Sequence, residues 1–486
     1  MSEEIATYLG PRGYTLKKEY LDIDELNLIR KELTVSPYVP KSSLAKPSPF
    51  KIYRESIKKV YLPKFYGLEN YGKPDAEITP QGLNIDVKFK GSLRDYQKPV
   101  VNKWLSAAKK KGCGLIEADC GAGKTCMAIW LIGQLKKKTL IIVHKEFLMN
   151  QWKERLEQFM PDAKIGKIQG PTIDVEGKDV VIGMLQSLSM KEYDQTLFLD
   201  FGFTIIDETH HVSAEVFSRV LFKAVTKYML GLSATMNRAD GLTKVFKMFL
   251  GNVEAKWKRT AQENVIVKAI EYNNKCEEYG RELTNYRGQA DYVKMITKIC
   301  EFSFRTEFIL KVAEDTWKKT KRQIMIIGHR KKQLIYIHDA IKHRGFATVG
   351  YYIGGMKEQD LKITESKDIV IATYTMAEEA LDIKSLATII MSTPKKDVRQ
   401  AVGRIMRSGG SKIVIDIIDQ HQIFQRHWTK RRAWYNKQKY KIMLTNSDGY
   451  KNNDWNDITK KKSNKNKVTT QALKTAINLN GKCLLD

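Results

Sequence analysis

Cysteine is scarce in this chain of 486 residues, and none of its six cysteines forms a CxxC pair. The spacing therefore supports neither a zinc ribbon nor a redox dithiol, and so low a density favours an intracellular protein over a disulfide scaffold. No apolar run approaches 18 residues, so we expect no segment that spans a bilayer. The first ten residues, MSEEIATYLG, also lack the basic and apolar regions of a signal peptide.

Acidic residues are too few to balance the basic ones. The chain has 83 Lys and Arg against 55 Asp and Glu, which gives a net charge of +28. An excess of this size indicates a polyanionic partner, and nucleic acid is the commonest one, with an anionic membrane surface as the alternative. The 42% of apolar residues suffices for a sizeable core, and the length suggests about three domains.

Two stretches alternate short apolar runs with longer, helix-like segments. Residues 91–255 hold runs at 114–116, 140–143, 180–182, 203–206 and 228–232; residues 256–425 hold runs at 324–328, 348–353, 368–372, 388–391 and 413–417. Strands that are buried on both faces of a parallel sheet have this pattern. We therefore predict an α/β protein with two tandem parallel-sheet domains, preceded by a small N-terminal domain (1–90) and followed by a basic extension (426–486).

The predicted extension mixes basic clusters with aromatic residues. The clusters are Lys430-Arg431-Arg432 and Lys460-Lys461-Lys462, and the aromatic residues between and beside them are Trp428, Trp434, Tyr435, Tyr440 and Trp455. This mixture is typical of a surface that tracks phosphates and stacks bases, although a solvated basic tail would have the same composition. A similar mixture at residues 36–72 leaves the same two alternatives.

The strongest motif is ADCGAGKT, residues 118–125, between the apolar run 114–116 and a helix-like run from Met127. Glycines let backbone N–H groups point at phosphate oxygens, and the N-terminus of the following helix adds positive potential. The pattern predicts a phosphate loop that binds ATP and Mg²⁺. Gly121, Ala122 and Gly123 would cradle the phosphates, Lys124 would neutralise the β- and γ-phosphates, and Thr125 would hold Mg²⁺. Ala118 stands where the strict pattern has Gly.

An acidic pair, Asp207-Glu208, follows the apolar run 203–206. An acid at this position lies at the carboxyl end of a parallel strand, where ligands bind. We predict that Asp207 holds Mg²⁺, directly or through water, and that Glu208 orients and deprotonates the attacking water. The neighbouring His210 and His211 have no third ligand at a spacing that suits a metal site.

Together these motifs resemble those of superfamily 2 helicases. The sequence DETH at 207–210 is similar to the DEAD/DEAH box, with Thr where Ala is usual, and QAVGRIMR at 400–407 matches motif VI in full. The resemblance covers residues 91–420 and implies two RecA-like domains that close on ATP. It further implies that arginines from the second domain stabilise the γ-phosphate, with Arg407 as the finger and Arg404 as a second phosphate contact.

Further elements extend the resemblance. LRDYQ at 93–97 is similar to the family's adenine-reading element and implies that Gln97 binds ATP; residues 373–383 correspond to motif V, with Ala380 in place of Gly, and imply a second ATP contact at Asp382. The resemblance implies that Gln400 and the motif III residues Ser233, Ala234 and Thr235 couple hydrolysis to nucleic-acid contact. RADG at 238–241 is typical of the XPB- and UvsW-like branch, which acts mainly on DNA.

Polar residues that follow the predicted strands are candidates for nucleic-acid contacts, because loops at the carboxyl ends of parallel strands converge on ligands. Such groups bind phosphates without reading sequence. The candidates are His144, Lys145, Gln186, His329, Arg330 and Thr373. Trp152 has helical spacing, so it is either a core residue or a wedge that stacks on bases.

The sequence therefore predicts an ATP-dependent helicase or translocase, similar to the transcript-release helicases of poxviruses and other large DNA viruses. DNA is the favoured substrate, with RNA or a hybrid left open. The resemblance implies a monomer that acts with transcription or replication and recombination machinery, in the host cytoplasm, the virus factory or the virion. Two alternatives are a nucleic-acid-binding transcription subunit with a degenerate ATPase, against which the complete motifs argue, and the motor of a nuclease, for which no HNH-like pattern or added carboxylate cluster is found.

Overall fold

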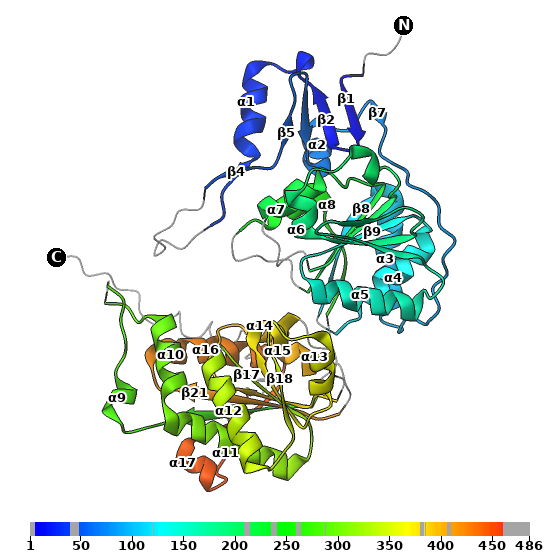
Figure 1. The fold of residues 1–486 in the computed structure, drawn as a ribbon. Coiled ribbons are helices and arrows are strands. Elements are labelled where there is room, and N and C mark those ends of the chain that lie inside the picture. Colours follow the sequence, from blue (N-terminus) through cyan, green and yellow to red (C-terminus); the bar gives the residue numbers. More distant parts are fainter. Residues whose placement is uncertain are drawn as a thin grey trace, which may run out of the picture. The chain divides into compact units, whose positions relative to one another are not determined.

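The structure is a computed structural model of the chain. It describes residues 5–38, 48–119, 121–208, 214–234, 241–258, 264–286, 288–379, 383, 385–405 and 410–459, and of these it gives the backbone alone for Gln195, Glu358, Glu379, Arg404 and Ile405. The chain divides into two compact units, Met1–Ala261 and Gln262–Asp486, which are described separately (Figure 1). Among the described residues, no helix has both the length and the hydropathy needed to cross a membrane.

A large parallel sheet forms the centre of the first unit. Its strand order is β11-β10-β12-β9-β13-β14-β8-β15, and only the β10–β11 pair is antiparallel. All five apolar runs predicted in this region are strands of this sheet. The strands are β8 (Cys113–Ala118), β9 (Thr139–Val143), β10 (Ile165–Gln169), β11 (Thr172–Asp174), β12 (Val180–Met184), β13 (Phe203–Ile206), β14 (Tyr228–Ser233) and β15 (Val253–Trp257).

Helices cover both faces of this sheet, which explains why its strands are apolar without interruption. Ile116, Ile141 and Ile205 belong to one buried cluster, together with side chains of α3 (Gln97–Lys111), α4 (Lys124–Leu135) and α5 (Glu146–Phe159). Alternate residues such as Leu115 and Leu140 belong to another cluster, with α6 (Leu185–Met190), α7 (Ala214–Leu221) and α8 (Thr243–Leu250). Figure 1 shows the two helix layers on opposite sides of the strands. A 3₁₀ helix spans Gln195–Phe198.

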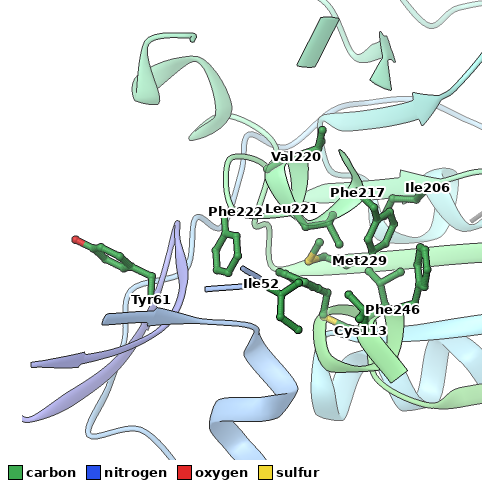
Figure 2. Close-up of a cluster of buried hydrophobic side chains, with 14 of the residues drawn as sticks. Ile52, Tyr61, Cys113, Ile206, Phe217, Val220, Leu221, Phe222, Met229 and Phe246 are labelled. Atoms are coloured by element: carbon green, nitrogen blue, oxygen red, sulfur yellow. The ribbon is translucent and has the colours of Figure 1, made fainter. Parts of the chain in front are cut away.

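The N-terminal residues form a small sheet of order β5-β6-β2-β1-β7 and a separate two-stranded sheet, β3-β4. The core of these N-terminal residues is continuous with the α7–α8 side of the first large sheet, and Figure 2 shows Ile52 among Phe222, Met229 and Cys113. Helix α2 packs on α8 and also closely on β2, where a Cβ on Gly67 would lie 2.1 Å from Cγ of Tyr14. The elements are β1 (Thr7–Gly10), β2 (Gly13–Lys17), a 3₁₀ helix (Lys18–Tyr20), α1 (Ile23–Glu32), β3 (Thr34–Val35), β4 (Phe50–Lys51), β5 (Arg54–Glu55), β6 (Lys59–Leu62), α2 (Lys64–Tyr71) and β7 (Ala76–Glu77).

The second unit also contains an eight-stranded sheet, of order β18-β19-β17-β20-β21-β16-β22-β23. Its pairs are parallel except β22–β23. The five predicted apolar runs are again strands, whereas the pattern of apolar runs does not predict β16, β22 or β23. The strands are β16 (Val265–Tyr272), β17 (Ile324–Gly328), β18 (Val349–Tyr352), β19 (Ile369–Thr373), β20 (Thr388–Met391), β21 (Lys412–Asp419), β22 (Lys441–Asn446) and β23 (Asn456–Asp457).

The start of the predicted basic extension belongs to this second unit. The boundary predicted at residue 426 falls inside α16, and β22 pairs in parallel with β16. Trp428 and Tyr435 are buried, with 6% and 0% of their surface exposed. These two rings are therefore core residues and not stacking platforms, because they lie on the helix face that packs on the sheet. Lys460-Lys461-Lys462 lies outside the described residues.

The helices of the second unit are, in chain order, α9 (Glu277–Gly280), α10 (Tyr292–Glu301), α11 (Ser303–Thr320), α12 (Lys331–Arg344), α13 (Glu358–Glu365), α14 (Tyr374–Glu379), α15 (Arg399–Ile405), α16 (Gln422–Lys437) and α17 (Ser447–Lys451). The central strands contribute Ile324, Ile326 and Ile390 to a single buried cluster with α10, α11 and α12. Polar residues that follow these strands are thereby held at one edge of a rigid sheet.

Candidate functional site

The phosphate loop lies between β8 and α4, as the sequence predicts. Gly121 and Gly123 have φ angles of +80° and +77°, in the left-handed region that favours glycine. A Cβ on Gly123 would also lie 2.4 Å from Nε2 of Gln97. Lys124 is the first residue of α4, so the loop ends at a helix N-terminus, where backbone N–H groups attract anions.

The predicted catalytic residues of the first unit lie together. Nζ of Lys124 is 3.5 Å from Oε1 of Glu208, and it donates a hydrogen bond to the Ala118 carbonyl at 3.3 Å. The backbone N–H of Glu208 donates to Oδ1 of Asp207 at 2.9 Å. Glu208 has a φ of +49°, which is strained for a residue other than glycine. Lys124, Asp207 and Glu208 therefore lie in one site at the carboxyl ends of β8 and β13.

The electrostatics of this site suit a divalent cation. The pKa of Asp207 is raised to about 6, first by burial and then by the charge of Glu208, although Lys124 and a hydrogen bond from Trp152 lower it. A cation beside the two carboxylates would offset the same burial and repulsion. Thr125 follows Lys124 in α4 and has an oxygen of the kind that Mg²⁺ binds. The described residues contain no cluster of three or more His, Cys, Asp or Glu that could hold a metal, so phosphate and water would complete the shell.

Gln97 lies against the phosphate loop. Its Oε1 accepts a hydrogen bond from the backbone of Arg94 at 2.9 Å, and its Nε2 donates to the Ala122 carbonyl at 2.8 Å. The ring of Tyr96 stacks on Trp257 with centroids 4.5 Å apart. The predicted adenine-binding residue thus shares a rigid hydrogen-bond network with the loop that would hold the phosphates.

Trp152 is a site residue to which sequence reasoning gave no role in the site. Its indole Nε1 donates a hydrogen bond of 2.8 Å to Oδ2 of Asp207, and only 1% of its surface is exposed. Of the two alternatives, the core position is confirmed and the wedge is wrong, because the ring is enclosed. Helix α5, which carries Trp152, begins directly after Lys145, so it connects a predicted nucleic-acid contact to Asp207. The sequence signal was the helical spacing of Trp152, and it did not indicate this bond.

The remaining predicted residues of the first unit lie at the same edge of the sheet. His144 and Lys145 are half-buried between β9 and α5, and burial lowers the pKa of Lys145. Gln186 is exposed in the first turn of α6, and Ser233 is buried at the end of β14, directly before Ala234. Since β12, β9, β13, β14 and β8 are successive neighbours, these residues flank the acidic pair. Thr209, His210, His211, Thr235 and residues 238–240 lie outside the described residues.

In the second unit, three predicted nucleic-acid contacts lie at the carboxyl ends of the neighbouring strands β17 and β19: His329 and Arg330 follow β17, and Thr373 is the last residue of β19. Nδ1 of His329 is 2.8 Å from Oγ1 of Thr393, and burial lowers the pKa of His329 to about 4. Arg330 donates to Oγ1 of Thr297 and to the Val293 carbonyl, both at 3.1 Å. Thr373 accepts a hydrogen bond from the first turn of α14. Gln400 is half-buried in α15, whereas Asp382, Arg407 and the Arg404 side chain lie outside what the structure describes.

Known proteins with similar sequences decide the family. A protein of Acanthamoeba polyphaga mimivirus named "Putative ATP-dependent RNA helicase L396" is 34% identical over 475 residues, which cover 94% of this chain and 91% of that protein. This chain is a superfamily 2 helicase. Residues 90–238 of the helicase also match the family described as "Type III restriction enzyme, res subunit". An African swine fever virus protein named "Putative ATP-dependent RNA helicase QP509L" is 25% identical over 377 residues, 71% of this chain and 73% of that protein.

The fold is that of known helicases. The solved structure of S. cerevisiae Dbp5 bound to RNA and ADP BeF3 matches with a TM-score of 0.50 at 12% identity, over 74% of this chain and 91% of that chain. The predictions of a superfamily 2 helicase, of two tandem RecA-like domains and of a viral kinship are therefore confirmed. The viral relatives' names state RNA, however, whereas the sequence analysis favours DNA.

We expect Trp152→Phe to move the acid limb of the helicase's pH–rate profile to higher pH. The indole hydrogen bond lowers the pKa of Asp207, so its loss raises that pKa further, and the carboxylate form that would bind Mg²⁺ becomes scarcer at a given pH. A hydrogen bond to a charged group is worth about 1.5–3 kcal/mol, so turnover near pH 6 should fall about tenfold or more. Steady-state ATP hydrolysis between pH 5.5 and 8.5 measures the shift.

Trp104→Phe is the matched control. Trp104 is also fully buried in the first unit, and its Nε1 donates to the Gly114 carbonyl at 3.0 Å instead of to a carboxylate. Both variants lose an indole N–H in the same domain, so both should lose comparable thermal stability. Only Trp152→Phe should change the pH profile; identical profiles for the two variants would show that the bond to Asp207 has no part in turnover.

Proposed function

We propose that this helicase hydrolyses ATP at the phosphate loop and uses the energy to move along or unwind nucleic acid, with DNA as the substrate. The proposal rests on one observation: the Lys124 ammonium lies 3.5 Å from the Glu208 carboxylate, beside the buried Asp207. A lysine at a helix N-terminus with two carboxylates at the adjacent strand end is the arrangement that phosphoryl transfer to water requires.

Each residue of the site has a distinct role in this proposal. Asp207 and Thr125 hold Mg²⁺, which when bound neutralises charge on the phosphate oxygens. Lys124 binds the β- and γ-phosphates, and Glu208 orients a water molecule and takes its proton. Gln97 binds the adenine end of the nucleotide, with Asp382 as a further contact. Arg404 and Arg407 of motif VI stabilise the charge that develops on the γ-phosphate.

Nucleic acid binds along the edges of the two sheets in this proposal. The residues at the carboxyl ends of β9, β12, β17 and β19 supply polar groups for phosphates, and the exposed Gln186 is the most accessible of them. Ser233, Ala234, Thr235 and Gln400 couple these contacts to the ATP site. Trp152 adds a direct path, because one helix links residues 144–145 to Asp207.

The RADG element supports DNA as the substrate, and the printed names of the viral relatives support RNA. We favour DNA, in viral transcription elongation or transcript release or in replication and recombination. The test is the rate of ATP hydrolysis with single-stranded DNA, duplex DNA, RNA and an RNA–DNA hybrid, each over a salt series. Stimulation by RNA alone would overturn the DNA assignment, and no hydrolysis with any of the four would favour a binding subunit without a motor.

The C-terminal residues 460–486 are expected to add nucleic-acid affinity without taking part in hydrolysis. They contain seven lysines and one aspartate, whereas Arg431 and β22 before them belong to the packed second unit. Truncation after Thr459 should therefore flatten the dependence of log affinity on log salt, by about 0.7–0.9 for each phosphate contact that is lost. Fluorescence anisotropy with a labelled oligonucleotide measures the slope. Basal ATP hydrolysis should be unchanged, and an unchanged slope would identify the segment as a solvated tail.

A further inference from the structure

The second unit contains a four-residue loop whose backbone carbonyls are all hydrogen-bonded to side chains. Residues 392–395 join β20 to the segment that leads into α15. Each of the four consecutive backbone carbonyls accepts a hydrogen bond from a side chain, and the four side chains come from four different helices. The bonds are Arg305 Nη1 to Ser392 at 2.6 Å, Tyr374 Oη to Thr393 at 2.6 Å, Tyr292 Oη to Pro394 at 3.0 Å and Arg431 Nη1 to Lys395 at 2.7 Å.

The two arginines are themselves fixed by buried aspartates of β21. Arg305 pairs with Asp419 and Arg431 pairs with Asp416, and no more than 1% of any of these four side chains is exposed. Each guanidinium uses two of its nitrogens on the carboxylate and a third on the loop. Apolar side chains often stabilise a core more than buried ion pairs do. The two ion pairs therefore indicate that the positions of these guanidinium groups matter.

Side chains of the loop add a connection to motif V. Nζ of Lys395 lies 2.6 and 2.5 Å from the two carboxylate oxygens of Glu378 in α14. Oγ1 of Thr393 contacts His329 at the end of β17. Since α14 follows Thr373 and also supplies Tyr374, the loop is bound to the motif V helix at two points before it continues to motif VI.

We propose that Arg305, Arg431, Tyr292 and Tyr374 are positioning residues that fix loop 392–395 and through it the helix α15, which carries motif VI. This inference rests on the proposed ATPase function. Helix α15 begins at Arg399, four residues after the loop, and Val398, Ala401 and Val402 are buried. The four positioning residues, which we call the clamp, fix the backbone that leads into motif VI. Small displacements of catalytic groups cost large factors in rate.

Tyr292→Phe combined with Tyr374→Phe tests the proposal, because it removes two loop bonds and keeps both rings in the core. We expect kcat for nucleic-acid-stimulated hydrolysis to fall about 10- to 100-fold, while KM for ATP and the affinity for nucleic acid change less than about twofold. Because a smaller folded fraction would also lower the apparent kcat at an unchanged KM, kcat is calculated per ATP-binding site titrated in each preparation. Tyr450→Phe is the matched control, since it removes a hydroxyl bond to Asp315 elsewhere in the second unit.

Amide hydrogen exchange gives a readout that does not depend on activity. Peptides that cover residues 392–405 should exchange faster in the double variant than in the wild type, and Tyr450→Phe should leave them unchanged. If the double variant has the wild-type kcat, or if exchange in these peptides is unchanged, the proposal that these residues position motif VI is wrong. If the wild type itself hydrolyses no ATP with any nucleic acid, the proposed function fails, and exchange alone then decides whether these hydroxyls fix the loop.

Discussion

Glu208→Gln should lower kcat for ATP hydrolysis by about 10²- to 10⁴-fold, the range that a general base contributes. The amide keeps the size of the carboxylate but cannot take a proton from water. ATP binding should persist, because Lys124 still begins α4 at the end of the phosphate loop. Phosphate release under saturating nucleic acid measures kcat, and a fluorescent ATP analogue measures binding.

Two further variants complete this experiment. Lys124→Ala should lose ATP affinity as well as turnover, since in the proposed function the ammonium binds phosphate, and it lies 3.5 Å from Glu208. Glu215→Gln is the control, because that carboxylate forms an exposed pair with Arg219 in the same domain. Nucleic-acid affinity should stay near the wild-type value in all three variants. Turnover at the wild-type rate in Glu208→Gln would remove Glu208 from the role of base.

The sequence predicted most strands of both sheets because strands buried on both faces are apolar at every position. The sequence pattern does not predict strand β16, because Lys268 and Glu271 interrupt its apolar residues. The structure accommodates Lys268 by placing its ammonium 5.3 Å from the centre of the Trp455 ring, a contact between residues 187 positions apart. No local pattern could reveal it, since the charge is tolerated only in the folded chain.

In the candidate site, too, the sequence predicts features that depend on neighbouring residues and misses a contact between distant ones. The phosphate loop and the acidic pair could be predicted because each follows a strand directly, and parallel strands bring their carboxyl ends to one edge. The bond from Trp152 to Asp207 could not, because it depends on how α5 packs on β9 and β12, next to the end of β13. An indole at helical spacing indicates burial and does not reveal its partner.

The sequence leaves two interpretations of the basic cluster 430–432, a phosphate-tracking surface or a solvated tail, and helix geometry separates its members. Phe424, Trp428, Arg431 and Tyr435 are the buried residues of α16, spaced as one face of a 3.6-residue helix requires. Lys430 lies on the exposed side. Arg431 therefore packs inside the second unit, whereas the adjacent Lys430 faces solvent.

Arg431→Met should destabilise the second unit by about 3–5 kcal/mol, the usual consequence of leaving a buried charge without its partner. Asp416 would lose two guanidinium hydrogen bonds of 2.8 Å and keep that from the Tyr435 hydroxyl at 3.2 Å. Lys430→Met should leave the unfolding midpoint unchanged, because Lys430 is exposed. Denaturant unfolding followed by hydrogen exchange in α16 and β21 peptides measures both variants within the second unit.

The double variant Asp416→Leu/Arg431→Met separates an unpaired charge from a lost contact. If the uncompensated aspartate causes the loss in Arg431→Met, removing it as well should recover a large part of the stability, since apolar side chains of similar volume can replace a buried ion pair. The loop bond to the Lys395 carbonyl stays absent in the double variant. Its stability should therefore return while its kcat stays low, because the clamp on motif VI requires the guanidinium itself. Equal destabilisation by Lys430→Met and Arg431→Met would contradict the burial of this pair.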